Sequence, residues 1–277
     1  FKLITANFFM KATFDLLGNI VLVKFPYDAK EKEKKKFAQK VLRENKSART
    51  VLEKTGKFKG LLRKQKTKFI LGEKTKEVLY RENNCFFRFN VDSTYFSPRL
   101  SNERKEIAGK IKKNDEVLVM FAGVAPFPII IAKNSKAKMI YSVEINREAS
   151  KYAKMNVALN KLKDKVEIVQ ANVKNFVKKF VKGKLSEENR RLSRFDVIVM
   201  PRPQLKESFL KEAFSLSKKR TRIFYYDFCR EDEKEDVLDR IKIEAKKAKK
   251  KIIILGMKNA GEIGNRRFRV RVDFIVL

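Results

Sequence analysis

Histidine is absent from the chain, and only two of its 277 residues are cysteines, Cys85 and Cys229. Without histidine there is no Ser-His-Asp triad, no Cys-His dyad and no histidine-ligated metal site. Two cysteines are too few for a disulfide framework, and they do not have the spacing of metal ligands. We therefore expect neither a histidine-dependent hydrolase nor a metalloprotein.

Long apolar runs are also missing. No stretch approaches the roughly 18 apolar residues that a membrane-spanning helix requires. The opening segment, residues 1–10, is mildly apolar, but it contains Lys2 and lacks a small-residue cleavage site. The sequence therefore predicts no membrane anchor and no secretion signal, and we expect a cytoplasmic protein.

Acidic residues are scarce beside basic ones: 33 Asp and Glu face 67 Lys and Arg, giving a formal net charge of +34. Self-repulsion on this scale is tolerated when the working partner is a polyanion. Disorder is the competing explanation, but 43% hydrophobic residues and 23 Phe predict a packed core. The composition thus favours a folded protein that binds nucleic acid.

The first ninety residues read as a small α/β unit. Residues 14–25 alternate around Gly18-Asn19 as two short strands joined by a turn do, and residues 28–45 have the apolar spacing of a helix. Further short strands are expected at 51–52, 68–71, 77–80 and 86–91.

From about residue 91 strands and helices alternate. After a helix at 98–113, strands are expected at 116–121, 138–143, 166–170, 195–200 and 222–226, and helices at 127–134, 147–160, 173–181, 205–217 and 232–247. Such alternation predicts a parallel sheet covered by helices on both faces. Two strands in succession, 251–255 and 268–276, close the chain and predict an antiparallel last strand. This is the pattern of a class I (Rossmann-like) S-adenosylmethionine methyltransferase sheet. A polar, basic surface loop is expected at 183–194.

Two features mark a cofactor site. A turn of small residues follows the first strand of this region, and Glu144 ends the second. The turn lets backbone N–H groups approach a ligand at the carboxyl end of the strand. It lacks the G-x-G-x-x-G pattern and a phosphate-binding lysine. An acid at the end of the second strand can accept both hydroxyls of a ribose. These two features alone fit S-adenosylmethionine, a nicotinamide cofactor, or a tight turn beside a solvent-facing acid.

Further motifs stand in a fixed order. They are Phe89-Asn90-Val91-Asp92, Tyr95-Phe96-Ser97-Pro98-Arg99-Leu100-Ser101-Asn102-Glu103-Arg104, Met120 to Phe127, Glu144-Ile145-Asn146, and Met200-Pro201-Arg202-Pro203. Together they closely resemble the archaeal and eukaryotic tRNA (guanosine-37 N1) methyltransferases, over nearly the whole chain. The resemblance implies that the family's small N-terminal domain is not included in this sequence, either because the molecule is a reduced version or because the chain is truncated.

The resemblance implies roles for individual residues. Glu103 would take the proton that guanine N1 carries at neutral pH, and Arg63 would stabilise the negative charge that develops on O6. Arg99 and Arg104 would hold the nucleotide and the helix. Pro201 and Pro203 would form a rigid wall of the base pocket. The residues implied at the S-adenosyl-L-methionine site are Tyr95, Arg99, Phe121, Ala122, Gly123, Val124, Glu144, Ile145, Asn172 and Pro201.

Four positions depart from the family's pattern. Val119 stands in place of an acid, Ala125 in place of a glycine, Asn172 in place of an aspartate, and Pro201 in place of the Asn of an Asn-Leu-Pro or Asn-Pro-Pro signature. The Met-Pro-Arg-Pro sequence resembles an archaeal subgroup associated with wyosine synthesis. Some members of that subgroup also methylate C7 of the tricyclic imidazoguanosine at position 37.

The resulting hypothesis has two domains, a small α/β domain at 1–90 that contributes to tRNA binding and a catalytic domain at 91–277. The protein would methylate tRNA guanosine 37 at N1, and also C7 of the tricyclic base, as a monomer without a metal. One alternative is a methyltransferase acting on another RNA position. The other is a basic, non-catalytic RNA-binding protein with a degraded cofactor pocket, which Val119 and Ala125 favour.

Overall fold

The computed structural model describes residues 12–56, 60, 62–181, 194–264 and 266–277, so the loop expected at 183–194 lies almost wholly outside the described residues. The chain divides into two compact units between Pro98 and Arg99, which is further along the chain than the domain boundary expected at residue 90. Residues 91 and 92 belong to the first unit because Gln65 Nε2 donates to the carbonyl of Val91 at 2.9 Å and Thr67 Oγ1 donates to Asp92 at 2.7 Å.

The first unit is built on a four-stranded sheet in the order β1-β2-β3-β4. Its strands are β1 (Thr13–Leu17), β2 (Ile20–Lys24), β3 (Thr50–Lys54) and β4 (Thr67–Gly72). Helix α1 (Glu31–Glu44) connects the parallel pair β2 and β3 and buries Ala38 and Val41 in the same core as the sheet. A hairpin of β5 (Glu77–Glu82) and β6 (Cys85–Asn90) completes the unit, as the sequence predicts.

Glycine is required at the β1–β2 turn. Gly18 has φ +55°, and a Cβ atom there would lie 1.8 Å from the carbonyl oxygen of Leu79. The backbone of the β1–β2 turn therefore packs directly against β5, which only a residue without a side chain permits.

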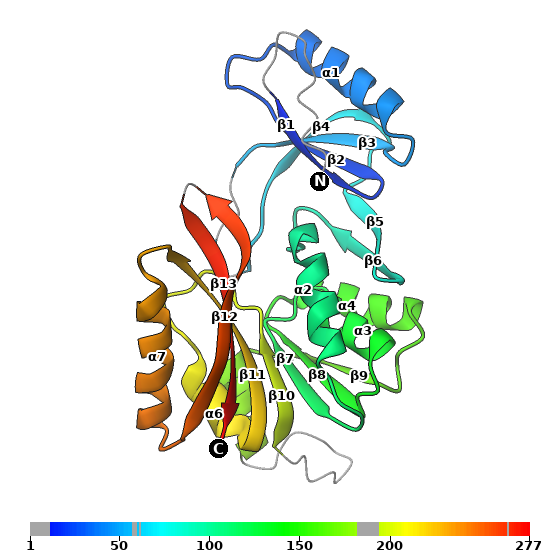
Figure 1. The fold of residues 1–277 in the computed structure, drawn as a ribbon. Coiled ribbons are helices and arrows are strands. Elements are labelled where there is room, and N and C mark those ends of the chain that lie inside the picture. Colours follow the sequence, from blue (N-terminus) through cyan, green and yellow to red (C-terminus); the bar gives the residue numbers. More distant parts are fainter. Residues whose placement is uncertain (1–11, 57–59, 61, 182–193, 265) are drawn as a thin grey trace. The chain divides into compact units, whose positions relative to one another are not determined.

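The second unit is a seven-stranded sheet in the order β12-β13-β11-β10-β7-β8-β9, with helices on both faces (Figure 1). Its strands are β7 (Glu116–Met120), β8 (Met139–Glu144), β9 (Val166–Gln170), β10 (Phe195–Met200), β11 (Ser217–Arg230), β12 (Ile252–Gly264) and β13 (Arg267–Val276). Its helices are α2 (Ser101–Gly109), α3 (Pro126–Asn134), α4 (Arg147–Leu159), α5 (Val173–Val181), α6 (Leu210–Leu216) and α7 (Lys234–Lys247). Only β13 runs antiparallel to its neighbours, β11 and β12. The class I methyltransferase architecture expected from the sequence is confirmed.

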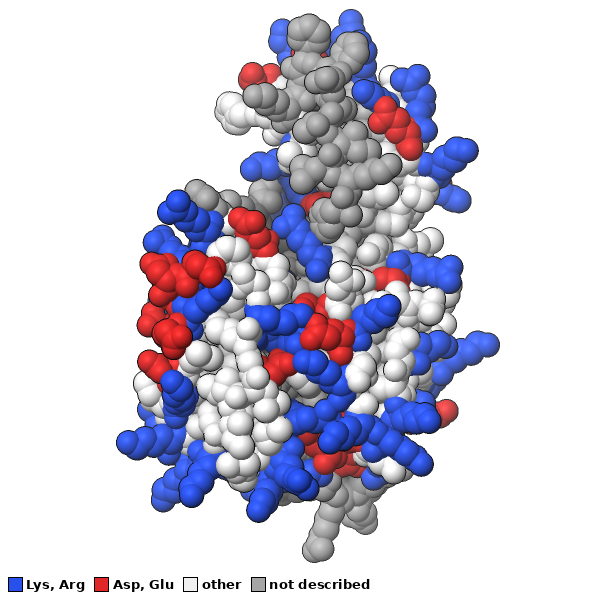
Figure 2. Space-filling view, viewed as in Figure 1, with Lys and Arg blue, Asp and Glu red and all other residues white. Residues whose placement is uncertain are grey.

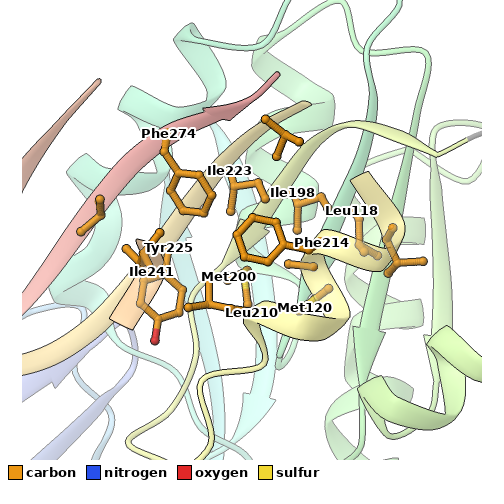
Figure 3. Packing of buried hydrophobic residues seen from close by; sticks show 14 of the residues in the cluster. Leu118, Met120, Ile198, Met200, Leu210, Phe214, Ile223, Tyr225, Ile241 and Phe274 are labelled. Carbon is orange, nitrogen blue, oxygen red and sulfur yellow. The ribbon is translucent and has the colours of Figure 1, made fainter. Parts of the chain in front are cut away.

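The main core lies in this second unit. Side chains from the sheet, among them Leu118, Ile198 and Ile223, pack with Phe214 of α6 (Figure 3). Strands β7 and β10 are buried along nearly their whole length, as parallel strands covered on both faces must be. This rigid sheet fixes the positions of the loops at its carboxyl edge.

Several element boundaries differ from the sequence-based expectation. The helix expected at 205–217 begins only at Leu210, because Phe209 adopts left-handed backbone angles with φ +59°. The helix expected at 98–113 is a 3₁₀ turn, Pro98–Leu100, followed by α2, which ends at Gly109. Strands β11 and β12 are much longer than expected. Pairing with β13 extends β11 to Arg230 and β12 to Gly264, and β11 begins early because Ser217 pairs with Phe195 of β10.

The surface carries the charge excess. Figure 2 shows Lys and Arg spread widely over the face it draws, while Asp and Glu gather at fewer places. Within the described residues, no helix is long and apolar enough to cross a membrane.

Candidate active site

A tight turn links β7 to α3. Phe121, Gly123 and Ala125 all have left-handed backbone angles, with φ of +55°, +59° and +65°. A non-glycine residue pays roughly 1 kcal/mol or more for this conformation, and Ala125 occupies the position while fully buried. The turn is held by backbone bonds from Ala122 N to the carbonyl of Val143 and from Ala125 N to the carbonyl of Ala122, both 3.0 Å. Strained backbone of this kind persists where the surrounding packing fixes it, and it is common at ligand sites.

Glu144 joins this turn to the end of β8. Its Oε2 accepts the N–H of Gly123 and its Oε1 accepts the N–H of Asn146, both at 2.7 Å. Burial raises the pKa of this carboxyl, while the backbone donors of Asn146 and Gly123 act in the opposite direction. Each oxygen retains a lone pair, so the carboxylate can accept two further hydrogen bonds from neighbouring hydroxyls.

A depression of about 690 Å³ lies beside Glu144, at the carboxyl ends of β8 and β9. The residues that line it are Ile145, Gln170, Ala171, Asn172, Asn175, Lys178 and Lys179. The Oδ1 of Asn172 accepts the N–H of Lys174 at 2.8 Å, which fixes the amide and leaves its N–H groups as donors. Ligands of open α/β sheets bind at this edge, and the depression has the polar and apolar lining that a nucleoside requires.

The helix α2 carries charge on its buried face. Leu100, Glu103, Arg104, Ile107 and Ala108 follow the three- and four-residue spacing of one helix face. Glu103 is only 5% exposed and Arg104 only 1%. The helical spacing therefore places Glu103 and Arg104 on the buried face of α2, where each charged group requires a partner.

Glu103 finds its partners on three strands. Its Oε2 accepts the hydroxyl of Tyr226 at 2.9 Å and Nη1 of Arg271 at 2.7 Å. Its Oε1 lies 2.7 Å from Nζ of Lys258. Burial, reinforced by the charge of Glu103, raises the pKa of Tyr226 well above its usual value, so its hydroxyl stays a donor.

Arg271 connects Glu103 to two further acids. Its guanidinium binds Asp273 through Nε at 2.6 Å and Glu106 through Nη2 at 2.6 Å. Burial alone would lower the pKa of Arg271, but the hydrogen bonds to Asp273 and Glu106 outweigh it and raise the pKa. We define Glu103, Tyr226, Arg271, Glu106, Asp273 and Lys258 as the Glu103 cluster.

A second buried ion pair fixes the Met-Pro-Arg-Pro segment. Arg202 is 2% exposed, binds Asp227 of β11 through Nη1, and donates from Nη2 to the carbonyls of Leu205 and Glu207 at 2.5 and 2.8 Å. The loop after β10 is thereby tied to the sheet and closed on itself. Pro201 and Pro203, on either side of Arg202, are half-buried.

The remaining predicted site residues are divided between the two units, with Arg63 and Tyr95 in the first and Arg99 and Arg104 in the second. In the first unit the structure brings together Arg63 and Tyr95, with the guanidinium 3.9 Å from the ring centre. Arg99 is exposed and lies in the 3₁₀ turn at the start of the second unit. Arg104 packs with its guanidinium 5.8 Å from the ring centre of Phe127.

Sequence reasoning missed the partners of Glu103. Arg271 and Asp273 lie on one face of β13, where alternation with apolar residues suggests an amphipathic edge strand. Both are buried, at 1% and 9% exposure, because β13 lies inside the sheet. The signal that could have revealed this buried cluster is in β13 itself. Every second residue from Arg267 to Asp273 is charged, although the strand has a neighbour on each side.

This chain is similar in sequence and in fold to known tRNA-modifying enzymes. A family model described as the TRM5/TYW2 methyltransferase domain matches residues 78–253, and one described as the TYW2 N-terminal domain matches residues 9–75. A Nanoarchaeum equitans protein named tRNA (guanine(37)-N(1))/4-demethylwyosine(37)-methyltransferase Taw22 is 32% identical, covering 96% of this chain and 100% of that protein. The crystal structure of Trm5b from Pyrococcus abyssi superposes with a TM-score of 0.81 at 29% identity, covering 95% of this chain and 74% of that one. A Methanocaldococcus jannaschii tRNA(Phe) (4-demethylwyosine(37)-C(7)) aminocarboxypropyltransferase is 28% identical, covering 88% and 90%.

Proposed function

The chain belongs to the TRM5/TYW2 methyltransferase family, and on that premise we propose that it transfers a methyl group from S-adenosylmethionine to N1 of guanosine 37 in tRNA. The observation that carries the proposal is the match along the whole Nanoarchaeum protein, whose name states this activity. The net charge of +34 suits a tRNA substrate, since Lys and Arg on phosphates supply much of the affinity for nucleic acid.

The carboxyl edge of the sheet fits S-adenosylmethionine, which supplies the methyl group when bound. Glu144 has lone pairs left for both ribose hydroxyls, and the depression bordered by Ile145 and Asn172 suits the adenine. The backbone of Phe121, Ala122, Gly123 and Val124 would approach the rest of the molecule. We propose that Tyr95, Arg99 and Pro201 complete this site.

Within the chain, Glu103 is the residue suited to take the proton from guanine N1. Its carboxylate is buried and anchored through Oε2 by Tyr226 and Arg271, so the side chain is already positioned when the base arrives. We propose that Arg63 faces O6, where negative charge develops as the proton leaves, and that Arg104 holds α2.

We propose that the same site also methylates C7 of the tricyclic 4-demethylwyosine. Pro201 offers neither a side-chain hydrogen bond nor a backbone N–H, so with Pro203 it selects by shape rather than by pairing a base edge. The name of the Nanoarchaeum protein includes this second substrate.

Replacing Pro201 with Asn should keep N1 methylation and remove most C7 methylation, measured by mass mapping of nucleosides from the two tRNA substrates. Retention of both activities in Pro201→Asn would refute the role of Pro201.

A second candidate is transfer of the aminocarboxypropyl group of the same cofactor to C7. It is favoured by the match of residues 9–75 to the TYW2 N-terminal domain and by the similarity to the Methanocaldococcus protein. The mass of the group added to the tricyclic base distinguishes the two activities directly.

The deciding experiment is methyl transfer to unmodified tRNA transcripts that carry either guanosine or adenosine at position 37. Methylation of the guanosine transcript alone supports the proposal, whereas equal methylation of both points to another RNA position. If calorimetry detects no S-adenosylmethionine binding, the protein is a non-catalytic RNA-binding protein.

We also propose that residues 1–90 contribute to tRNA binding, that 91–277 carry catalysis, and that the enzyme acts as a cytoplasmic monomer without a metal. Among the residues described in the structure, no group of three or more His, Cys, Asp or Glu could hold a metal ion. Activity that survives a strong chelator, and a sedimentation mass equal to that of one chain, would support these points.

A further inference from the structure

The two carboxylate oxygens of Glu103 have different surroundings. Oε2 is held by the Tyr226 hydroxyl and the Arg271 guanidinium, both from residues that are at most 1% exposed. Among the residues that the structure describes, Oε1 has one partner, the ammonium group of Lys258 at 2.7 Å. A carboxylate oxygen can accept two or more hydrogen bonds, so Oε1 is the oxygen with capacity for a new donor.

Lys258 differs from the other partners of Glu103 because its side chain is 41% exposed and comes from β12, at the edge of the sheet. It also forms an ion pair with Oε2 of Glu106. When Lys258 leaves Oε1, it therefore stays bound within the cluster. Burial alone would lower the pKa of Lys258, but its bonds to Glu103 and Glu106 outweigh this and raise the pKa, so the group remains cationic.

We propose that Lys258 is a positioning residue that occupies Oε1 of Glu103 until the N1–H of the target guanine takes the place of its ammonium group. The inference rests on the proposed function and names the oxygen and the counter-ion used in it. Oε1 is the proton acceptor, Oε2 is the anchored oxygen, and Lys258 shifts its contact to Glu106 when the base enters.

The step balances with the tRNA base and S-adenosylmethionine as the two reactants of the proposed function. The N1–H bond breaks and the proton forms an O–H bond with Oε1. The N1 electron pair bonds to the methyl carbon, whose bond to the sulfonium sulfur breaks with its electrons remaining on sulfur. Glu103 becomes neutral as the base is methylated, and Lys258 then balances the remaining charge of Glu106.

The test compares Lys258→Met with Lys110→Met. Lys110 has nearly the same side-chain exposure, 40%, and also pairs with Glu106, at 3.3 Å, but its other carboxylate partner is Asp273 rather than Glu103. Both variants remove one positive charge from the same surface, so any general loss of tRNA affinity is shared. The measurement is the single-turnover rate of methyl transfer to guanosine-37 transcript, at saturating tRNA and S-adenosylmethionine, as a function of pH.

In Lys258→Met, the pH of half-maximal rate should rise by about one unit, because removing an adjacent cation favours the protonated carboxyl. The groups that remain around Glu103 are the neutral Tyr226 hydroxyl on β11, the charged Arg271 and Asp273 on β13, and the charged Arg104 and Glu106 on α2, and both variants retain all of them. Lys110→Met should keep the wild-type profile, and Lys258→Arg should restore it. If Lys258→Met fails to fold, Lys258→Gln serves in its place.

The proposal is overturned if the profile of Lys258→Met superimposes on wild type, or if Lys110→Met shifts equally. A loss confined to tRNA affinity would instead make Lys258 a phosphate contact. Absence of methyl transfer by the wild-type enzyme at every pH counts against the proposed function itself, so the two failures are distinguishable.

Discussion

Two buried carboxylates of the second unit, Glu103 and Asp227, are each bound by an arginine and a tyrosine, but they differ in how completely they are satisfied. Each oxygen of Asp227 has two donors: Arg202 and the Phe228 N–H on Oδ1, and Tyr225 and Arg240 on Oδ2. Within the described part of the chain, Oε1 of Glu103 has only Lys258 as a partner. Burial and ion pairing are thus common to both sites, and the spare hydrogen-bonding capacity of Oε1 is the feature that separates Glu103, the proposed proton acceptor, from Asp227.

The largest effect should come from removing the basicity of Glu103. In Glu103→Gln the side chain keeps its shape and cannot take a proton at neutral pH, so single-turnover methylation should slow by about 10²–10⁴-fold with little change in tRNA affinity. Asp227→Asn is the matched variant in the other site, and we expect its rate to fall far less. Equal rate losses in the two variants would contradict the special role proposed for Glu103 as the proton acceptor.

Asp227 should matter most for stability. Asp227→Ala leaves Arg202 buried without its carboxylate, which should lower the free energy of unfolding by about 3–5 kcal/mol, measured by urea denaturation. The double variant Arg202→Met/Asp227→Leu removes both charges and should recover much of that loss. A double variant no more stable than Asp227→Ala would mean that the loop carbonyls bound by Arg202, rather than the ion pair, carry the stability.

Glu144 extends the comparison to a carboxylate whose hydrogen-bond partners are backbone N–H groups. Glu144→Ala should weaken S-adenosylmethionine binding by roughly 1.5–3 kcal/mol, because the ribose hydroxyls lose a charged acceptor. Calorimetric titration measures this, with Glu116→Ala, at the opposite end of the neighbouring strand, as the control. Unchanged affinity in Glu144→Ala would assign the ribose to other residues.

The smallest effect concerns Glu106, at the rim of the Glu103 cluster. Hydrogen bonding to Arg271 lowers its pKa to about 2 from an ordinary 4.5, so its contribution to stability is present above pH 4.5 and is lost as pH falls towards 2. Because the side chain is 36% exposed, solvent screening limits this contribution to about 1 kcal/mol. The free energies of unfolding of wild type and Glu106→Gln, measured with denaturant, should converge as the pH falls through that range. A difference that stays constant with pH would contradict this contribution of Glu106.

Most of the second unit is predictable from sequence because buried parallel strands are apolar throughout and their helices are periodic. Strands β9 and β10 and helix α5 begin and end where expected. The length of β11 and β12 is not predictable, since it depends on pairing with β13 over residues that are polar and carry no strand pattern. The ionic partners of Glu103 were missed for the same reason: a charged residue on a strand is read as exposed until the strand order is known.

The position of β13 has a consequence for synthesis of the protein. The ribosome makes Glu103 early, while Arg271 and Asp273 belong to the last strand described, which lies between β11 and β12. A nascent chain that has emerged only as far as β12 lacks the strand to which β12 pairs and the guanidinium that anchors the carboxylate. Any chain cut short before residue 271 therefore carries Glu103 without the guanidinium that anchors it. Under the role proposed for Glu103, translation that stops early yields a chain without an anchored proton acceptor.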